Sequence, residues 1–154
     1  MRITVLLIAL LFAAPMANAQ HFALNKKTVN ACIAQLKGGK DLFKRIGNTC
    51  AIPLFERECR AGGKNAKTYW VTCPPAISQQ MERWIKVANK AVQKRGGKYN
   101  KERERLMQYV GDGTLVCKSA TSEGGTSSAT GTDYCRAILL TQTYGMLRFL
   151  ETAR

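Results

Sequence analysis

The sequence predicts an all-α fold, a small helical domain of about four to five helices cross-linked by disulfides, formed by residues 20–154 as a single domain. Two observations lead to this prediction. Apolar residues recur at helical spacing in several segments, and Gly-Gly doublets or Gly-rich stretches separate these segments. An even number of cysteines follows an N-terminal export signal. The cysteines are Cys32, Cys50, Cys59, Cys73, Cys117 and Cys135.

Short helices are expected in the N-terminal half. Residues 25–36 place apolar side chains on one helical face and precede a Gly-Gly doublet. Residues 41–46 are expected to form a short segment that ends at the following Gly-Asn pair. Residues 50–60 are expected to form a turn at their proline and then a brief helix. The β-branched and aromatic stretch 68–72 is too short and isolated to predict a sheet.

The clearest helix is expected over residues 76–95. Pro74-Pro75 favours a helix start, and Gly96-Gly97 favours a stop. The apolar residues of this segment fall within an arc of roughly 100° at about 100° per residue. We expect that arc to face the core. It comprises Ile77, Met81, Trp84, Ile85, Ala88 and Val92.

Two more helices are expected towards the C-terminus. Asn100 can cap a helix that runs through Val110, and the sequence Gly-Asp-Gly at 111–113 is expected to interrupt it. The stretch 119–133 is small, polar and Gly-rich, which predicts a loop. A final helix is expected from about residue 133 to about residue 151.

Residues 1–19 have the pattern of a signal peptide. Arg2 provides a positive charge, residues 3–14 are apolar, and Ala17-Asn18-Ala19 matches a small-x-small cleavage site. The apolar run is shorter than the roughly 20 residues that a membrane span needs. We therefore expect a mature chain that starts at Gln20, is periplasmic or secreted, and has no stable membrane insertion after signal removal.

The cysteines are expected to pair as disulfides, which persist in oxidising compartments. Six cysteines allow 15 connectivities, and the sequence does not choose among them. Cys117 and Cys135 flank the expected loop and could close it. Zinc, the competing use of cysteine, favours close C-x₂-C pairs, often with histidine, and the sequence has no C-x₂-C pair. No metal site is predicted.

The chain is strongly basic, with a formal charge of +14, which falls to +13 when Arg2 leaves with the signal peptide. A basic exported protein attracts polyanions such as cell-wall polymers, anionic lipid or nucleic acid. The alternative is a solvated surface that keeps the protein in solution. On the 76–95 helix, four cations fall within roughly 80° on the side opposite the apolar arc. This candidate basic stripe comprises Arg83, Lys86, Lys90 and Lys94.

No catalytic or cofactor-binding residue is predicted. His21 is the only histidine and lies two residues into the expected mature chain, where it is poorly placed as a general base. Glu56 and Glu58 are too close in sequence to face each other across a substrate, and Glu102 and Glu104 lie among arginines. The sequence therefore favours a non-enzymatic binding protein.

Scattered positions from about residue 50 to 150 resemble the LprI-type lysozyme-inhibitor domain, a family of small exported helical proteins. The first half shares a cysteine, a Gly-Gly doublet, a second cysteine and a helix bearing Trp and Asn. The C-terminal third shares a second cysteine pair around a G-G-T element, then Leu-Thr and Leu. The matching residues are Cys59, Gly62, Gly63, Thr68, Cys73, Gln80, Trp84, Asn89, Cys117, Glu123, Gly124, Gly125, Thr126, Cys135, Leu140, Thr141 and Leu147.

The sequence also departs from the family pattern. Ile85, Ala88 and Val92 stand where Asp, Leu and Tyr are usual, and residues 106–116 lack the family's Arg-Asp pair. The resemblance implies a disulfide-tied helical domain that binds, and inhibits, a lysozyme-like protein at the cell envelope. Its candidate binding loop is Glu123, Gly124, Gly125 and Thr126, within the 119–133 stretch. The alternative is a basic protein that binds anionic envelope polymers through the stripe.

Overall fold

The computed structural model describes residues 22–61, 71–119 and 125–153. The described chain is helical and contains no strand, which confirms the all-α prediction. Short helices come first and three long helices follow. The elements are α1 (Lys26–Ala34), α2 (Leu42–Arg45), the π-helical segment η1 (Ile46–Ala51), α3 (Ile52–Ala61), α4 (Cys73–Arg95), α5 (Lys98–Ser119) and α6 (Gly125–Thr152).

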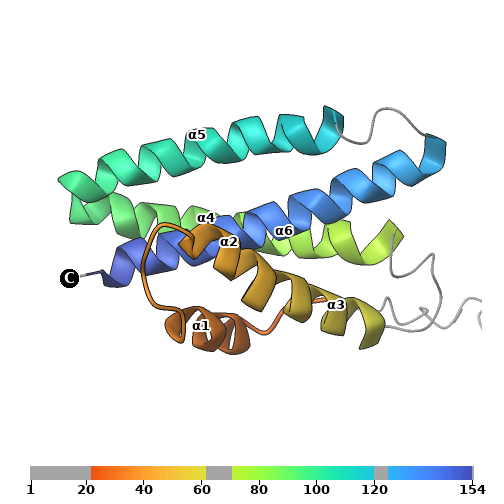
Figure 1. The fold of residues 1–154 in the computed structure, drawn as a ribbon, viewed down its shortest axis with the longest axis horizontal. Coiled ribbons are helices and arrows are strands. Elements are labelled where there is room, and N and C mark those ends of the chain that lie inside the picture. The colour runs from red at the N-terminus through yellow and green to blue at the C-terminus, as the bar shows by residue number, and fades with distance from the viewer. Residues whose placement is uncertain (1–21, 62–70, 120–124, 154) are drawn as a thin grey trace, which may run out of the picture.

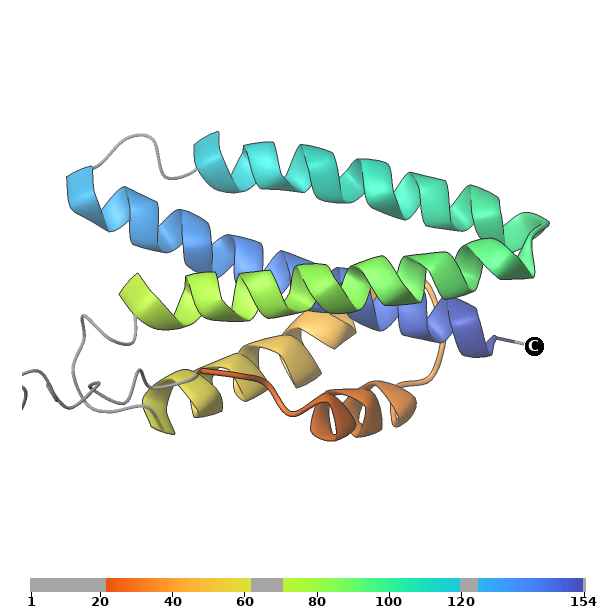
Figure 2. The same ribbon diagram turned by 180° about the vertical axis from the view of Figure 1, so that it is seen from behind.

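The long helices α4, α5 and α6 run antiparallel to their neighbours in the chain, as Figures 1 and 2 show. The helices α1 and α3 lie on the side of α4 and α6 that is opposite α5 (Figure 1), whereas Phe43 of α2 contacts Tyr109 of α5. Gly96 and Gly97 form the turn between α4 and α5, and both have positive φ angles, 67° and 56°. Because glycine adopts such angles without steric cost, the expected stop at this doublet is confirmed.

The core lies where α4 and α6 meet the short helices. Five of the six residues in the predicted apolar arc of α4 are buried, namely Ile77, Met81, Ile85, Ala88 and Val92. Trp84 is half-buried at the edge of this core, with its ring 5.3 Å from that of Tyr144 on α6. The expected face of α4 is therefore confirmed, with Trp84 at its border rather than inside.

The N-terminal helices differ from the expectation between residues 41 and 61, where α2, η1 and α3 follow one another without a break. Gly47 does not end a helix. It is buried where a Cβ would come 2.2 Å from the side-chain amide of Gln142, so glycine permits close packing against α6.

Pro53 does not make a turn. The π-helical turn before it, in which the Ile52 N–H bonds the Gly47 carbonyl, accommodates a ring that clashes in an ideal α-helix.

The two C-terminal helices are longer than expected. α5 continues through residues 111–113, so the expected interruption is wrong, and Asn100 lies inside its first turn rather than at a cap. A Cβ at Gly113 would come 2.8 Å from the Leu139 side chain, so the absence of a side chain at Gly113 lets α5 pack closely against α6. The expected 119–133 loop is also wrong in extent, because α6 begins at Gly125. Helix propensity is low there, but the Cys117–Cys135 disulfide joins α5 and α6 at this end.

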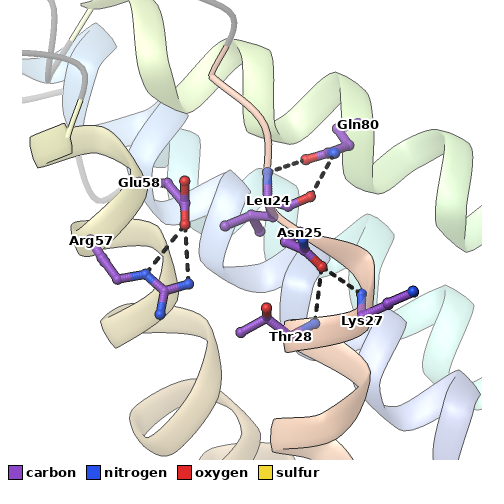
Figure 3. Close-up of polar contacts among 7 residues, drawn as sticks. All are labelled: Leu24, Asn25, Lys27, Thr28, Arg57, Glu58 and Gln80. Atoms are coloured by element: carbon purple, nitrogen blue, oxygen red, sulfur yellow. Dashed lines mark hydrogen bonds and ion pairs between the residues drawn. The ribbon is translucent and has the colours of Figure 1, made fainter.

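The start of the described chain is fixed by side chains on α1 and α4 (Figure 3). Asn25 caps α1, because its side-chain oxygen accepts hydrogen bonds from the backbone N–H groups of Lys27 and Thr28. Gln80 on α4 bonds both backbone polar groups of Leu24. Leu24 and Phe22 are buried, so this short extended segment belongs to the core.

Three disulfides connect the six cysteines, and none of the six is free. Cys117 and Cys135, whose pairing the sequence left open as one possibility, are joined. Each of the other two bridges joins two consecutive cysteines of the sequence and closes a short stretch of chain. They are Cys32–Cys50, which ties α1 to η1, and Cys59–Cys73, which ties α3 to α4.

Candidate functional site

The basic stripe lies intact on the outer face of α4. Arg83, Lys86, Lys90 and Lys94 are all exposed. They are separated by three, four and four residues on one unbroken helix, so at about 1.5 Å per residue the stripe is about 16 Å long. The regular geometry of the helix therefore places four cations in one line along α4, the green helix in the foreground of Figure 2.

None of the carboxylates in the described part of the chain forms an ion pair with the stripe. Within the described residues, every ion pair is formed by an arginine outside the stripe, and no stripe residue takes part in one. The carboxylate nearest to the stripe in sequence, Glu82, bonds Arg136 of α6 at 2.5 Å. Charge that is not locally compensated keeps its field for a partner in solution.

A cation from another helix lies over an aromatic ring at the edge of the core. The ammonium group of Lys26, at the start of α1, lies 5.6 Å from the centre of the Trp84 ring. Trp84 belongs to the apolar arc of α4, on the side opposite the stripe, so Lys26 lies outside the basic stripe. Helical periodicity does not predict this contact, because it links only residues of one helix and Lys26 is 58 positions from Trp84 in sequence. Val87, 63% exposed, adds an apolar contact beside the stripe.

The candidate binding loop is only partly described. Glu123 and Gly124 lie outside the described residues, whereas Gly125 and Thr126 form the first turn of α6. The Cys117–Cys135 disulfide, with Cα atoms 5.7 Å apart, connects the helices on either side. Residues 1–21, which include the expected signal peptide and His21, and residues 68–70 also lie outside the described part of the chain.

The four carboxylates that were weighed as acid/base candidates each lie beside an arginine. The partners are Glu56 with Arg60, Glu58 with Arg57, Glu102 with Arg105 and Glu104 with Arg103. Figure 3 shows the pair on α3, where both Nε and an Nη atom of Arg57 donate to Glu58. In residues 22–61, 71–119 and 125–153, no three His, Cys, Asp or Glu side chains gather as a metal site would need.

No helix in the described part of the chain is long and apolar enough to cross a bilayer. Comparison with protein-family models, with curated proteins and with solved structures finds no match.

Proposed function

We propose that this protein is an exported, non-enzymatic binding protein whose α4 face contacts an anionic polymer of the cell envelope. The observation that carries the proposal is a line of four exposed cations on one helix, none of which forms an ion pair with a described carboxylate. The exposed Val87 beside that line adds apolar surface for a partner.

The shape of the stripe favours a linear partner. Four cations in a single row about 16 Å long present charge along one direction, as an extended polymer does. A lipid surface extends in two directions, so a single row of cations matches it less well than it matches a linear polymer. The ion pair between Glu82 and Arg136 adds no free charge beside the row. The mechanism is electrostatic: the cations displace counterions from the polymer, so affinity falls as salt rises.

Export is part of the same proposal. The signal-peptide pattern of residues 1–19 directs the chain out of the cytoplasm. The three disulfides fit a compartment in which thiols stay oxidised, such as the periplasm or the extracellular space. In either place, envelope polymers are among the polyanions that a protein with an expected charge of +13 would attract.

A second proposal is that the protein inhibits a lysozyme-like protein. The Cys117–Cys135 bridge supports it, because a segment anchored at both ends loses less entropy on binding. Charge opposes it. C-type lysozymes are basic, and two positively charged surfaces repel and associate slowly. We therefore rank it after polymer binding.

Titration of the oxidised mature protein into a fluorescently labelled linear polyphosphate tests the first proposal. We expect saturable binding that weakens with salt and that the triple substitution Lys86→Gln, Lys90→Gln and Lys94→Gln reduces by about tenfold or more. A matched control replaces Lys37, Lys40 and Lys101, three exposed lysines outside the stripe, and removes the same charge. Equal loss in both variants would contradict a role for the stripe.

The same preparations separate the alternatives. Phosphatidylglycerol vesicles that bind more tightly than the polymer would replace the polymer with a lipid surface. Inhibition of lysozyme on an uncharged chitin oligosaccharide would favour the second proposal, because the protein cannot act by coating such a substrate.

A further inference from the structure

A pocket of about 300 Å³ lies between α1 and the C-terminal end of α6. One part of its wall is apolar and includes Ile33, Leu36 and Phe149. The polar part includes Asn30 from α1 and Arg148 from α6. Apolar walls with a few converging polar groups are typical of small-molecule sites, whose volumes start at about 300 Å³.

A hydrogen bond from a buried tyrosine fixes the orientation of the Asn30 side-chain amide. The hydroxyl group of Tyr144, which is 1% exposed, donates a hydrogen bond of 2.8 Å to the Asn30 side-chain oxygen. With that oxygen engaged, the amide NH₂ of Asn30 is the group left to interact with a ligand, and it is a hydrogen-bond donor.

The second polar group is also a donor. Arg148 carries five N–H donors in a planar fork, and one of its nitrogens bonds Glu151 on the next turn of α6. Thr152 donates its hydroxyl hydrogen to carbonyl oxygens of its own helix, so it has no hydrogen left to donate to a ligand. The donors and the positive charge of the pocket therefore come from Asn30 and Arg148, and together they match a carboxylate.

We propose that this pocket binds a medium-chain monocarboxylate, with the carboxylate on Arg148 and Asn30 and the aliphatic chain against Ile33, Leu36 and Phe149. Since a water-sized group occupies about 30 Å³, the pocket has room for about ten non-hydrogen atoms. Octanoate has that size. The overall positive charge of the protein favours an anionic ligand. The site is separate from the α4 stripe, so the proposal does not depend on polymer binding.

Isothermal titration of the folded, oxidised protein with octanoate below its micelle concentration tests the proposal. We expect saturable one-to-one binding, with octanol bound about tenfold more weakly because it lacks the charge that pairs with Arg148. Absence of saturable binding, or equal binding of octanol, would overturn the proposal.

Two substitutions in one ion pair should act in opposite directions. Arg148→Gln should weaken octanoate binding by about tenfold, since it removes a charge-assisted hydrogen bond. Glu151→Gln should tighten binding, because it releases Arg148 from a competing carboxylate. Retained helical circular dichroism shows that each variant is folded. If Arg148→Gln unfolds the chain, the Glu151→Gln result decides alone, and unchanged or weaker binding there would overturn the proposal.

The chain offers a matched control in Arg105→Gln. Arg105 forms the same kind of pair with Glu102 three residues away, beside an apolar groove of about 480 Å³ lined by Phe43 and Tyr109. No asparagine lines that groove, so we expect octanoate binding to be unchanged. A loss equal to that of Arg148→Gln would mean that octanoate responds only to net charge, which would contradict the assigned pocket.

Discussion

Gln80 forms two hydrogen bonds with the backbone of Leu24, although 56 positions separate them in sequence. The Leu24 N–H donates to the Gln80 side-chain oxygen at 2.8 Å, and the Gln80 side-chain nitrogen donates to the Leu24 carbonyl at 3.0 Å (Figure 3). A glutamine amide thus replaces the strand partner that an extended segment would otherwise need. This contact holds the start of the described chain against α4.

Gln80→Ala should therefore loosen the N-terminal segment. Two partly buried backbone groups lose their partners, so we expect a loss of about 1–3 kcal/mol of unfolding free energy. Amide hydrogen exchange at Leu24 should become faster. Gln79→Ala, at the exposed neighbouring position, is the control. Unchanged exchange at Leu24 would show that burial of Leu24 and Phe22 alone holds the segment.

Trp84→Ala should destabilise the protein by about 3 kcal/mol, the lower end of the range for large aromatic core residues, because the ring is only half-buried. The substitution removes contacts with Tyr144 and with Lys26. Chemical denaturation provides the measurement. Val87→Ala, three residues along α4 and 63% exposed, should leave the midpoint nearly unchanged. Equal midpoints for both variants would mean that Trp84 contributes no more than a surface residue.

The disulfides predict two results. Mass spectrometry of the oxidised mature protein should detect no free thiol. Replacing both Cys117 and Cys135 by Ser should cost about 3 kcal/mol, chiefly because the unfolded chain regains freedom. A smaller loss, below about 1 kcal/mol, would indicate that packing between α5 and α6 already fixes this end.

Tyr144 predicts a loss of stability at high pH. Burial raises the pKa of the Tyr144 hydroxyl group, while nearby Arg148 and the hydrogen bond to Asn30 lower it by less. The stabilisation is fully present below the unfolded pKa, near 10, and is lost as pH rises through the higher folded value. Denaturation curves across that range should therefore show a steeper fall for the native protein than for Tyr144→Phe. Parallel curves would contradict the direction of this pKa shift.

Helical periodicity predicted α4 well, because a long amphipathic segment between Pro74-Pro75 and Gly96-Gly97 carries its own start, stop and buried face. Glycine and proline were misread where tertiary contacts outweigh local preference. Gly47 lies against Gln142 and Gly113 against Leu139, so both glycines permit close helix packing instead of breaking a helix.

The candidate functional sites were likewise predictable only in part. The stripe was predictable because its four members share one helix and one face. Lys26 over Trp84, and the pairing of Asn30 with Tyr144 behind the α1–α6 pocket, join residues far apart in sequence. No local pattern encodes these contacts. Cysteine spacing likewise favoured disulfides and only the folded chain shows the connectivity.

The salt dependence of binding tests the central claim about α4 most directly. We would measure the affinity for a labelled single-stranded oligonucleotide, used as a linear polyanion, from low to physiological salt. Because each phosphate contact contributes about −0.7 to the slope of log K against log salt, Lys86→Gln, Lys90→Gln and Lys94→Gln together should reduce the slope by about 2. The control at Lys37, Lys40 and Lys101 should keep the native slope. Equal slopes for the two triple variants would contradict the account, since binding would then follow net charge and not the stripe.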